Sequence, residues 1–220
     1  GRLNGLPTGH EAYPRAAQHK TGRATVPGLW EKKTKPIVNN ESADMLRMLN
    51  SGFGDLANKA NDLYPEALRD GIDALNEHIY PRLNNGVYRT GFATTQVAYE
   101  EAFAEVFETL DELETRLATG GPLLFGDLLT ETDVRLFVTL VRFDAAYYGL
   151  FKCNLRRIAD YPALQAYMMR VLNVPGVRDT VNIDHIKRGY YSIKALNPTR
   201  IVPVGPDLPG LDEVSLRSSK

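Results

Sequence analysis

The chain has 220 residues, of which 43% are hydrophobic and 24% charged, and its formal net charge at pH 7 is −1. These values are typical of a soluble globular protein, and the near-zero charge argues against nucleic acid or an anionic membrane as a partner. The single cysteine, Cys153, excludes an internal disulfide and a multi-cysteine metal site, so we expect a metal-free protein of the reducing cytoplasm.

The first part of the chain predicts a loop, a β-hairpin and a helix, in that order. Residues 1–22 are polar and show no clear period. Apolar, β-prone residues at 24–30 and 37–38 flank a charged turn, which predicts two paired strands. A helix follows from about residue 42, where Ser42 is a candidate cap, and the glycines near 51–55 predict its end.

The remainder, to about residue 195, is predicted to be helical, with an extended tail. Two amphipathic stripes favour helices, one at Leu63, Leu68, Ile72, Leu75 and Ile79 and another at Val106, Leu110, Leu113 and Leu117. Thr130-x-x-Asp133 predicts a capped helix start, and a further helix covers about 162–173. Four prolines at 198, 203, 206 and 209 predict a tail that lies extended on the surface.

Two short motifs near the hairpin are compatible with a ligand site. Val26-Pro27 lies between strand-like residues, as an ordinary edge proline or as a cis bond that turns the Val26 backbone towards a ligand. Glu41-Ser42 opens the following helix, where Ser42 could simply cap it. A helix N-terminus also binds a carboxylate and a glutamate binds an ammonium, so the pair suits a γ-glutamyl group.

Seven segments together resemble the glutathionyl-hydroquinone reductases, an omega-like (xi-class) group of glutathione transferases. The resemblance extends over about residues 4–206, although Gly28 departs from the aliphatic residue usual in that family. The segments are TGRATVPGLW (21–30), IVNNESAD (37–44), NNGVYRTGFA (84–93), RFDAAY (142–147), FKCN (151–154), DHIKRGYY (184–191) and NPTRIVP (197–203).

The resemblance implies an α+β fold, in which a partial thioredoxin-like, glutathione-binding domain at 1–55 precedes an all-helical glutathione-transferase C-terminal domain at 56–220. Glutathione would act as a substrate, without metal. The glutathione-binding positions implied are Arg23, Ala24, Thr25, Val26, Glu41 and Ser42. A homodimer built from the helical domains is also implied, and the stripe at Leu63, Leu68 and Ile72 is a candidate surface for it.

The implied reaction begins when a cysteine thiolate attacks the glutathione sulfur of a glutathionyl-hydroquinone and releases the hydroquinone. A second glutathione then resolves the enzyme–glutathione disulfide. The catalytic tyrosine implied is Tyr88, which exchanges a proton with the hydroquinone, and Tyr147 and Tyr190 favour the thiolate. The residues alone do not select these three among 11 tyrosines, and Tyr148 and Tyr191 are adjacent alternatives. A phenol is nonetheless a proton donor at neutral pH.

Cys153 is the only thiol, and we interpret it as a buried structural cysteine in a helical stretch. The family's nucleophile belongs to a Cys-Pro motif, which does not occur in these 220 residues. We therefore expect a longer protein whose earlier segment carries that motif, and no turnover from this chain alone. Two alternatives stay open: an omega-type thioltransferase or dehydroascorbate reductase, and a non-catalytic glutathione-binding scaffold.

Overall fold

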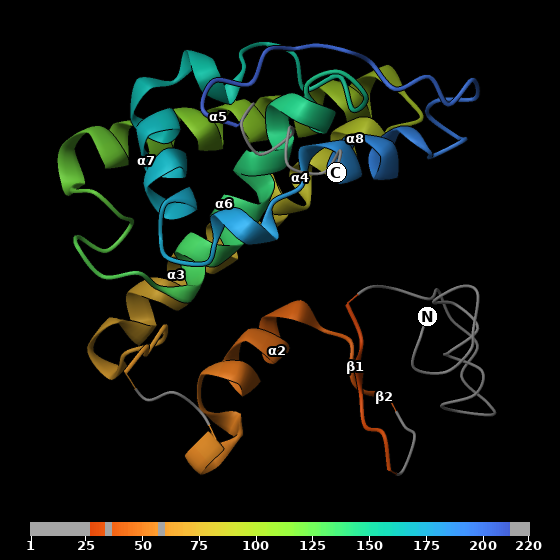
Figure 1. Ribbon diagram of the computed structural model, residues 1–220. Coiled ribbons are helices and arrows are strands. Elements are labelled where there is room, and N and C mark those ends of the chain that lie inside the picture. The colour runs from red at the N-terminus through yellow and green to blue at the C-terminus, as the bar shows by residue number, and fades with distance from the viewer. Residues whose placement is uncertain (1–26, 34–36, 57–59, 212–220) are drawn as a thin grey trace. The chain divides into compact units, whose positions relative to one another are not determined.

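The computed structural model describes residues 27–33, 37–56 and 60–211, and these form two compact units, Gly1–Tyr64 and Pro65–Lys220. Figure 1 shows the elements of both units with their labels. The α+β class predicted from the sequence is confirmed, since a two-stranded sheet with a helix is followed by a unit made of helices.

The first unit contains the predicted hairpin. Strands β1 (Leu29–Trp30) and β2 (Ile37–Asn39) are antiparallel, with Leu29 opposite Asn39 and Trp30 opposite Ile37. Helix α2 (Ser42–Arg47) follows and continues into a π-helical segment, Met48–Gly52. The cap of α2 is Glu41, whose N–H donates to the Asn39 side-chain oxygen at 2.7 Å, so Ser42 is the first helical residue and not the predicted cap.

Residues 62–64 also belong to the first unit. The Asn50 side chain donates to Asp62 at 2.9 Å and accepts the N–H of Leu63 at 2.8 Å, while the Arg47 guanidinium lies 4.0 Å above the Tyr64 ring. Leu63 is therefore outside any helix, although the sequence pattern placed it on a helical stripe. The glutathione-binding and helical roles assigned to 1–55 and 56–220 stay predictions.

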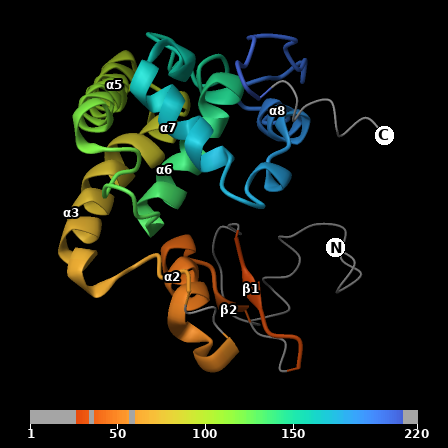
Figure 2. The same ribbon diagram turned by 60° about the vertical axis from the view of Figure 1, so that its left-hand side comes forward.

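The regular structure described in the second unit is helical, apart from two isolated β-bridges that join Leu123 to Gly126 and Phe125 to Leu128. Its longer elements are α3 (Arg69–Ile79), the π-helical segment η5 (Tyr80–Asn84), α4 (Gly86–Gly91), α5 (Gln96–Gly120), α6 (Glu131–Arg142), the π-helical segment η6 (Phe143–Tyr147), α7 (Pro162–Leu172) and α8 (Ile183–Tyr191). Single 3₁₀ turns cover Glu66–Leu68, Ile158–Asp160 and Arg178–Thr180. In Figures 1 and 2, α6 lies amid the other helices of this unit.

Helix ends follow the local sequence where a cap or a breaker was visible. Helix α5 ends at Gly120, and Gly121 has φ of +123°, a conformation that favours glycine. Helix α6 starts after Thr130, whose N–H donates to the Asp133 carboxylate at 2.8 Å, as the capping pattern predicted. Helix α7 begins with Pro162, whose missing N–H costs nothing at a first helical position.

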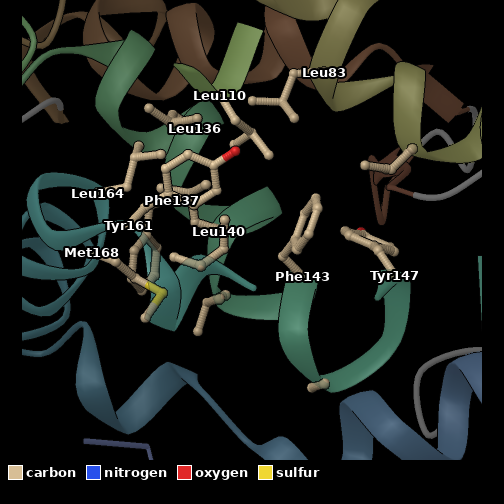
Figure 3. Packing of buried hydrophobic residues seen from close by; sticks show 14 of the residues in the cluster. Leu83, Leu110, Leu136, Phe137, Leu140, Phe143, Tyr147, Tyr161, Leu164 and Met168 are labelled. Carbon is tan, nitrogen blue, oxygen red and sulfur yellow. The ribbon is translucent and has the colours of Figure 1, made fainter. Parts of the chain in front are cut away.

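The core forms where α6 packs against α3, α7, η5 and η6. The stripe of α5 at Val106, Leu110, Leu113 and Leu117 is buried, as its spacing predicted. Ile72 and Ile79 of α3 are also buried in this core, so Ile72 is not available for the predicted dimer surface. Figure 3 shows Leu136, Phe137, Leu140 and Phe143 of α6 and η6 among side chains of the neighbouring helices.

The described part of the tail after α8, residues 192–211, has no helix or strand, as the prolines predicted, and a few polar contacts hold it. The Lys187 ammonium donates to the carbonyl oxygens of Val204 at 2.8 Å and Gly205 at 3.1 Å. Leu208 and Leu211 are buried, so the tail also contributes to the core. No helix in the described ranges is long and apolar enough to cross a bilayer.

Candidate functional site

The three predicted tyrosines come together through their hydroxyl groups. Tyr88 lies in α4, Tyr147 is the last residue of η6, and Tyr190 lies in α8. The Tyr190 oxygen is 2.6 Å from that of Tyr88 and 2.8 Å from that of Tyr147, and the Tyr88 and Tyr147 oxygens are 3.4 Å apart. We call these three residues the tyrosine cluster. Its convergence joins segments that are far apart in the sequence.

Two π-helical segments precede or contain two of the cluster's tyrosines. Pro81 has no N–H, so the regular hydrogen bonds of α3 cannot continue past it, and the chain widens until the Asn85 N–H donates to the Tyr80 carbonyl at 2.8 Å. Helix α6 widens in the same way, since the Tyr148 N–H donates to the Phe143 carbonyl at 2.8 Å. Tyr88 lies about one turn after the π-helical segment η5, and Tyr147 is the last residue of η6.

The cluster has a buried end and an open end. Tyr147 is 3% exposed, Tyr190 is half-buried, and Tyr88 is 37% exposed. Burial, reinforced by the neighbouring phenols, raises the pKa of Tyr147 well above its usual range. Burial also raises the pKa of Tyr190 to about 12, so both groups are neutral phenols at physiological pH.

The number of hydroxyl protons in the cluster indicates which tyrosine can donate a hydrogen bond to a ligand. Three hydroxyls carry three protons, and the two short contacts use two of them. A buried donor without an acceptor is costly, and the two shorter contacts favour the arrangement in which Tyr147 donates to Tyr190 and Tyr190 donates to Tyr88. In this arrangement the remaining O–H belongs to Tyr88, the most exposed of the three, and it can donate to a ligand.

The structure also shows which tyrosine of each adjacent pair lies in the cluster. Tyr147 and Tyr190 do so, whereas within the described residues no hydrogen bond joins Tyr148 or Tyr191 to it. The Tyr191 hydroxyl instead lies against Gly149, where an added Cβ would be 2.7 Å away.

A buried phenyl ring that the sequence analysis did not single out lies behind the cluster. Phe151 is fully buried, and its ring centroid is 5.2 Å from those of Tyr88 and Tyr147 and 5.8 Å from that of Tyr190. The FKCN segment contains Phe151, but no spacing rule points to a contact between it and residues 88 and 190. The signal that could have found it is Gly91, a glycine at the end of α4 that leaves room for a ring.

The predicted glutathione-binding residues are only partly described. Glu41 and Ser42 are exposed at the start of α2. Arg23, Ala24, Thr25 and Val26, together with the Val26-Pro27 bond, whose cis form is one of the two alternatives given by the sequence, lie outside the described residues.

Cys153 has the properties of a structural cysteine. It is fully buried, and burial raises the pKa of its thiol to about 12, which leaves almost no reactive thiolate at neutral pH. The predicted helix around Cys153 is wrong, because the chain is irregular there and Lys152 adopts a left-handed conformation with φ of 60°. In the described ranges, no three His, Cys, Asp or Glu side chains gather as a metal site would require.

This fold is that of a glutathione S-transferase. The family described as glutathione S-transferase, C-terminal domain, matches residues 96–170, which extend from α5 into α7. Among solved structures, glutathione-bound YqjG, a glutathione transferase homolog from Escherichia coli K-12, superposes with a TM-score of 0.90 at 48% identity and covers 94% of this chain and 67% of its own. Glutathione transferase Xi 1 from Trametes versicolor superposes with a TM-score of 0.89 at 52% identity, and the match covers 94% of this chain and 72% of the Trametes chain.

Curated relatives define the family more closely. Glutathionyl-hydroquinone reductase PcpF of Sphingobium chlorophenolicum is 53% identical over 212 residues, 95% of this chain and 67% of PcpF. Glutathionyl-hydroquinone reductase YqjG of Escherichia coli (strain K12) is 50% identical over 198 residues, 90% of this chain and 60% of YqjG. The chain belongs to the glutathionyl-hydroquinone reductases of the glutathione S-transferase superfamily, and it spans 60–67% of the length of these two relatives.

Proposed function

We propose that the protein reduces glutathionyl-hydroquinones with glutathione, and that the tyrosine cluster supplies the proton. A cysteine thiolate attacks the glutathione sulfur, the carbon–sulfur bond breaks, and its electron pair passes to the ring carbon, which takes up a proton to give the hydroquinone. Glutathione then attacks the enzyme–glutathione disulfide and leaves as glutathione disulfide. The ring is reduced, and the thioether sulfur of the conjugate and the thiol sulfur of the second glutathione are oxidised to the disulfide.

The observation that carries this proposal is the exposed Tyr88 hydroxyl at the open end of the tyrosine cluster. Tyr88 can donate its proton to the ring, and the phenolate that remains accepts a charge-assisted hydrogen bond from Tyr190 at 2.6 Å. Tyr147 in turn donates to Tyr190. The resemblance implies that Tyr147 and Tyr190 stabilise the cysteine thiolate. The distances between the hydroxyl oxygens favour a direct hydrogen bond from Tyr190 to Tyr88, which Tyr147 reinforces through Tyr190.

The thiolate must come from a cysteine other than Cys153, whose burial and raised pKa make it unsuitable. Because the chain has no second cysteine, the proposal places the nucleophile outside these 220 residues. Cys153 serves packing.

Glutathione is proposed to bind at the positions that the resemblance implies, Arg23, Ala24, Thr25 and Val26 with Glu41 and Ser42. Glu41 and Ser42 are exposed, which a contact with a ligand requires. The Ser42 hydroxyl and the first N–H groups of α2 suit the carboxylate of the γ-glutamyl group, and Glu41 suits its ammonium.

We further propose a cytoplasmic homodimer that pairs through its helical units. The interface must use surface other than Ile72, which is buried within the chain. Sedimentation of the full-length protein at micromolar concentration tests the pairing, and a monomer would contradict it.

Product analysis on the full-length protein tests the proposed reaction. With a glutathionyl-hydroquinone and excess glutathione, we expect hydroquinone and glutathione disulfide in a one-to-one ratio. A mixed disulfide of glutathione and 2-mercaptoethanol should be turned over less efficiently, as judged by kcat/KM. Preference for the mixed disulfide would favour the thioltransferase alternative, and binding of glutathione without turnover of either substrate would favour a scaffold.

A further inference from the structure

One phenyl ring touches every member of the tyrosine cluster. The Phe151 ring stacks on Tyr147 with an interplanar angle of 21° and meets Tyr88 and Tyr190 edge to face, at 61° and 80°. Such ring pairs prefer defined separations and angles, so each contact restricts a phenol ring in both position and tilt. Phe151 is 0% exposed and therefore has little freedom to follow a tyrosine that moves.

The glycine at the end of α4 makes room for this ring. A Cβ built on Gly91 would lie 2.6 Å from Phe151 Cδ1 and 2.8 Å from its Cβ, distances that real Cβ atoms essentially never show. Gly91 is three residues after Tyr88 on the same short helix. The missing side chain thus lets Phe151 approach the backbone of the helix that carries Tyr88.

The three tyrosines otherwise depend on separate elements. Tyr88 is on α4, Tyr147 on η6 and Tyr190 on α8, and the hydroxyl oxygens must stay within a few tenths of an ångström to keep contacts of 2.6 and 2.8 Å. A shared buried ring is a direct way to hold three such elements in register. The contact with Phe92, at 5.6 Å between centroids, extends the same ring packing to the residue that follows Gly91.

We propose that Phe151, seated against Gly91, is the positioning residue that holds Tyr88, Tyr147 and Tyr190 at hydrogen-bonding distance. This role rests on the proposed function only in its consequence for turnover. The arrangement of the cluster itself can be measured without any reaction.

Variants of Phe151 and Gly91 in the full-length protein, with matched controls, test the proposal. Phe151→Leu removes the ring, and Gly91→Ala keeps the ring but displaces it. The matched controls are Phe137→Leu, which removes another buried phenyl from the same core, and Gly120→Ala, at the last residue of α5, where an added Cβ meets nothing within 4 Å. The double variant Gly91→Ala with Phe151→Leu tests whether the two positions act through one contact.

The first readout is the absorbance of phenolate at 295 nm as pH rises, with Tyr190→Phe identifying the contribution of Tyr190. Loosening the cluster admits water, so the pKa of Tyr190 should fall from about 12 towards the ordinary value of about 10 in Phe151→Leu and in Gly91→Ala. The second readout is kcat for a glutathionyl-hydroquinone, which should fall by up to about 10²-fold in both variants, as misplaced reacting groups do. Both controls should keep the native titration and kcat.

The double variant should have a kcat no lower than that of Phe151→Leu, because Gly91→Ala has no ring left to displace. Should Phe151→Leu fail to fold, Gly91→Ala against Gly120→Ala tests the same contact with the ring still present. A native titration and kcat in Gly91→Ala, or effects equal to those of the controls, would overturn the proposal. If Tyr88→Phe does not change kcat, the proposed function fails, while the titration still decides whether Phe151 positions the cluster.

Discussion

The hydrogen-bonded group around Asp133 and the tyrosine cluster both contain tyrosine hydroxyls, and they differ in charge and in exposure. At the start of α6, the Asp133 carboxylate accepts the N–H groups of Leu124 and Thr130, the Thr130 hydroxyl and the Tyr167 hydroxyl, at 2.8 to 3.1 Å. All of its donors are satisfied by one buried anion. The tyrosine cluster has no anion, and its outermost hydroxyl is exposed. The closed group stabilises the fold, whereas the outermost hydroxyl of the open group is accessible to a ligand.

The largest expected effect is on the closed group. Asp133→Ala leaves three or more buried donors without an acceptor, each costing about 1–3 kcal/mol, so the free energy of unfolding should fall by more than about 3 kcal/mol. Asp127→Ala, at an exposed acid of the preceding loop, is the matched control and should change little. Urea denaturation measures both, and equal stabilities would show that Asp133 does not hold this region together.

The second prediction compares one tyrosine from each group. Tyr190→Phe removes the donor that supports Tyr88, and we expect kcat for a glutathionyl-hydroquinone to fall roughly tenfold, as the loss of a hydrogen bond of about 1.5 kcal/mol to a charged group implies. Tyr167→Phe should instead lower stability by about 1 kcal/mol and leave kcat unchanged. Steady-state kinetics and urea denaturation are measured on both variants. A loss of kcat in Tyr167→Phe with native kcat in Tyr190→Phe would contradict the roles given to the two groups.

The pH dependence of stability provides a third prediction. The pKa of Tyr147 is raised by burial in the folded protein, so its neutral form is favoured there. Its contribution to stability is fully present below the unfolded pKa of about 10 and is lost as the pH rises above it. The stability of the native protein relative to Tyr147→Phe should therefore decrease between about pH 9 and about pH 11. A constant difference would mean that Tyr147 is not desolvated.

The smallest expected effect belongs to Cys153. Because its thiol is buried and its pKa is about 12, Cys153→Ala should leave kcat and KM unchanged in the full-length protein. The variant should lose about 1 kcal/mol of stability to the small cavity. Loss of turnover without loss of folding would make Cys153 the nucleophile and would overturn the proposed mechanism.

The sequence predicted those parts of the fold whose causes are local. Thr130 with Asp133 starts α6, because a cap acts within a few residues. Leu63 and the segment around Cys153 were placed in helices wrongly. The Leu63 N–H donates to the Asn50 side chain and not to a helical carbonyl. Near Cys153, the left-handed conformation of Lys152 is incompatible with a helix.

The tyrosine cluster could not be predicted from spacing. Residues 88, 147 and 190 lie far apart in the sequence. Neither the π-helical segments near Tyr88 and Tyr147 nor the space that Gly91 leaves for Phe151 has a periodic signature in the sequence. The resemblance to the family supplied the three residue numbers. Their catalytic roles, like those of Glu41 and Ser42, stay predictions.

The most direct test of the central claim is the effect of Tyr88→Phe on two substrates of the full-length protein. Reduction of a glutathionyl-hydroquinone needs a proton on the ring carbon, whereas exchange with the mixed disulfide of glutathione and 2-mercaptoethanol does not. We expect Tyr88→Phe to lower kcat for the hydroquinone conjugate by roughly 10²–10⁴-fold and to spare the mixed disulfide, with Tyr148→Phe as the matched control. Equal losses on both substrates, or near-native turnover of the conjugate, would contradict the assignment of Tyr88 as the proton donor.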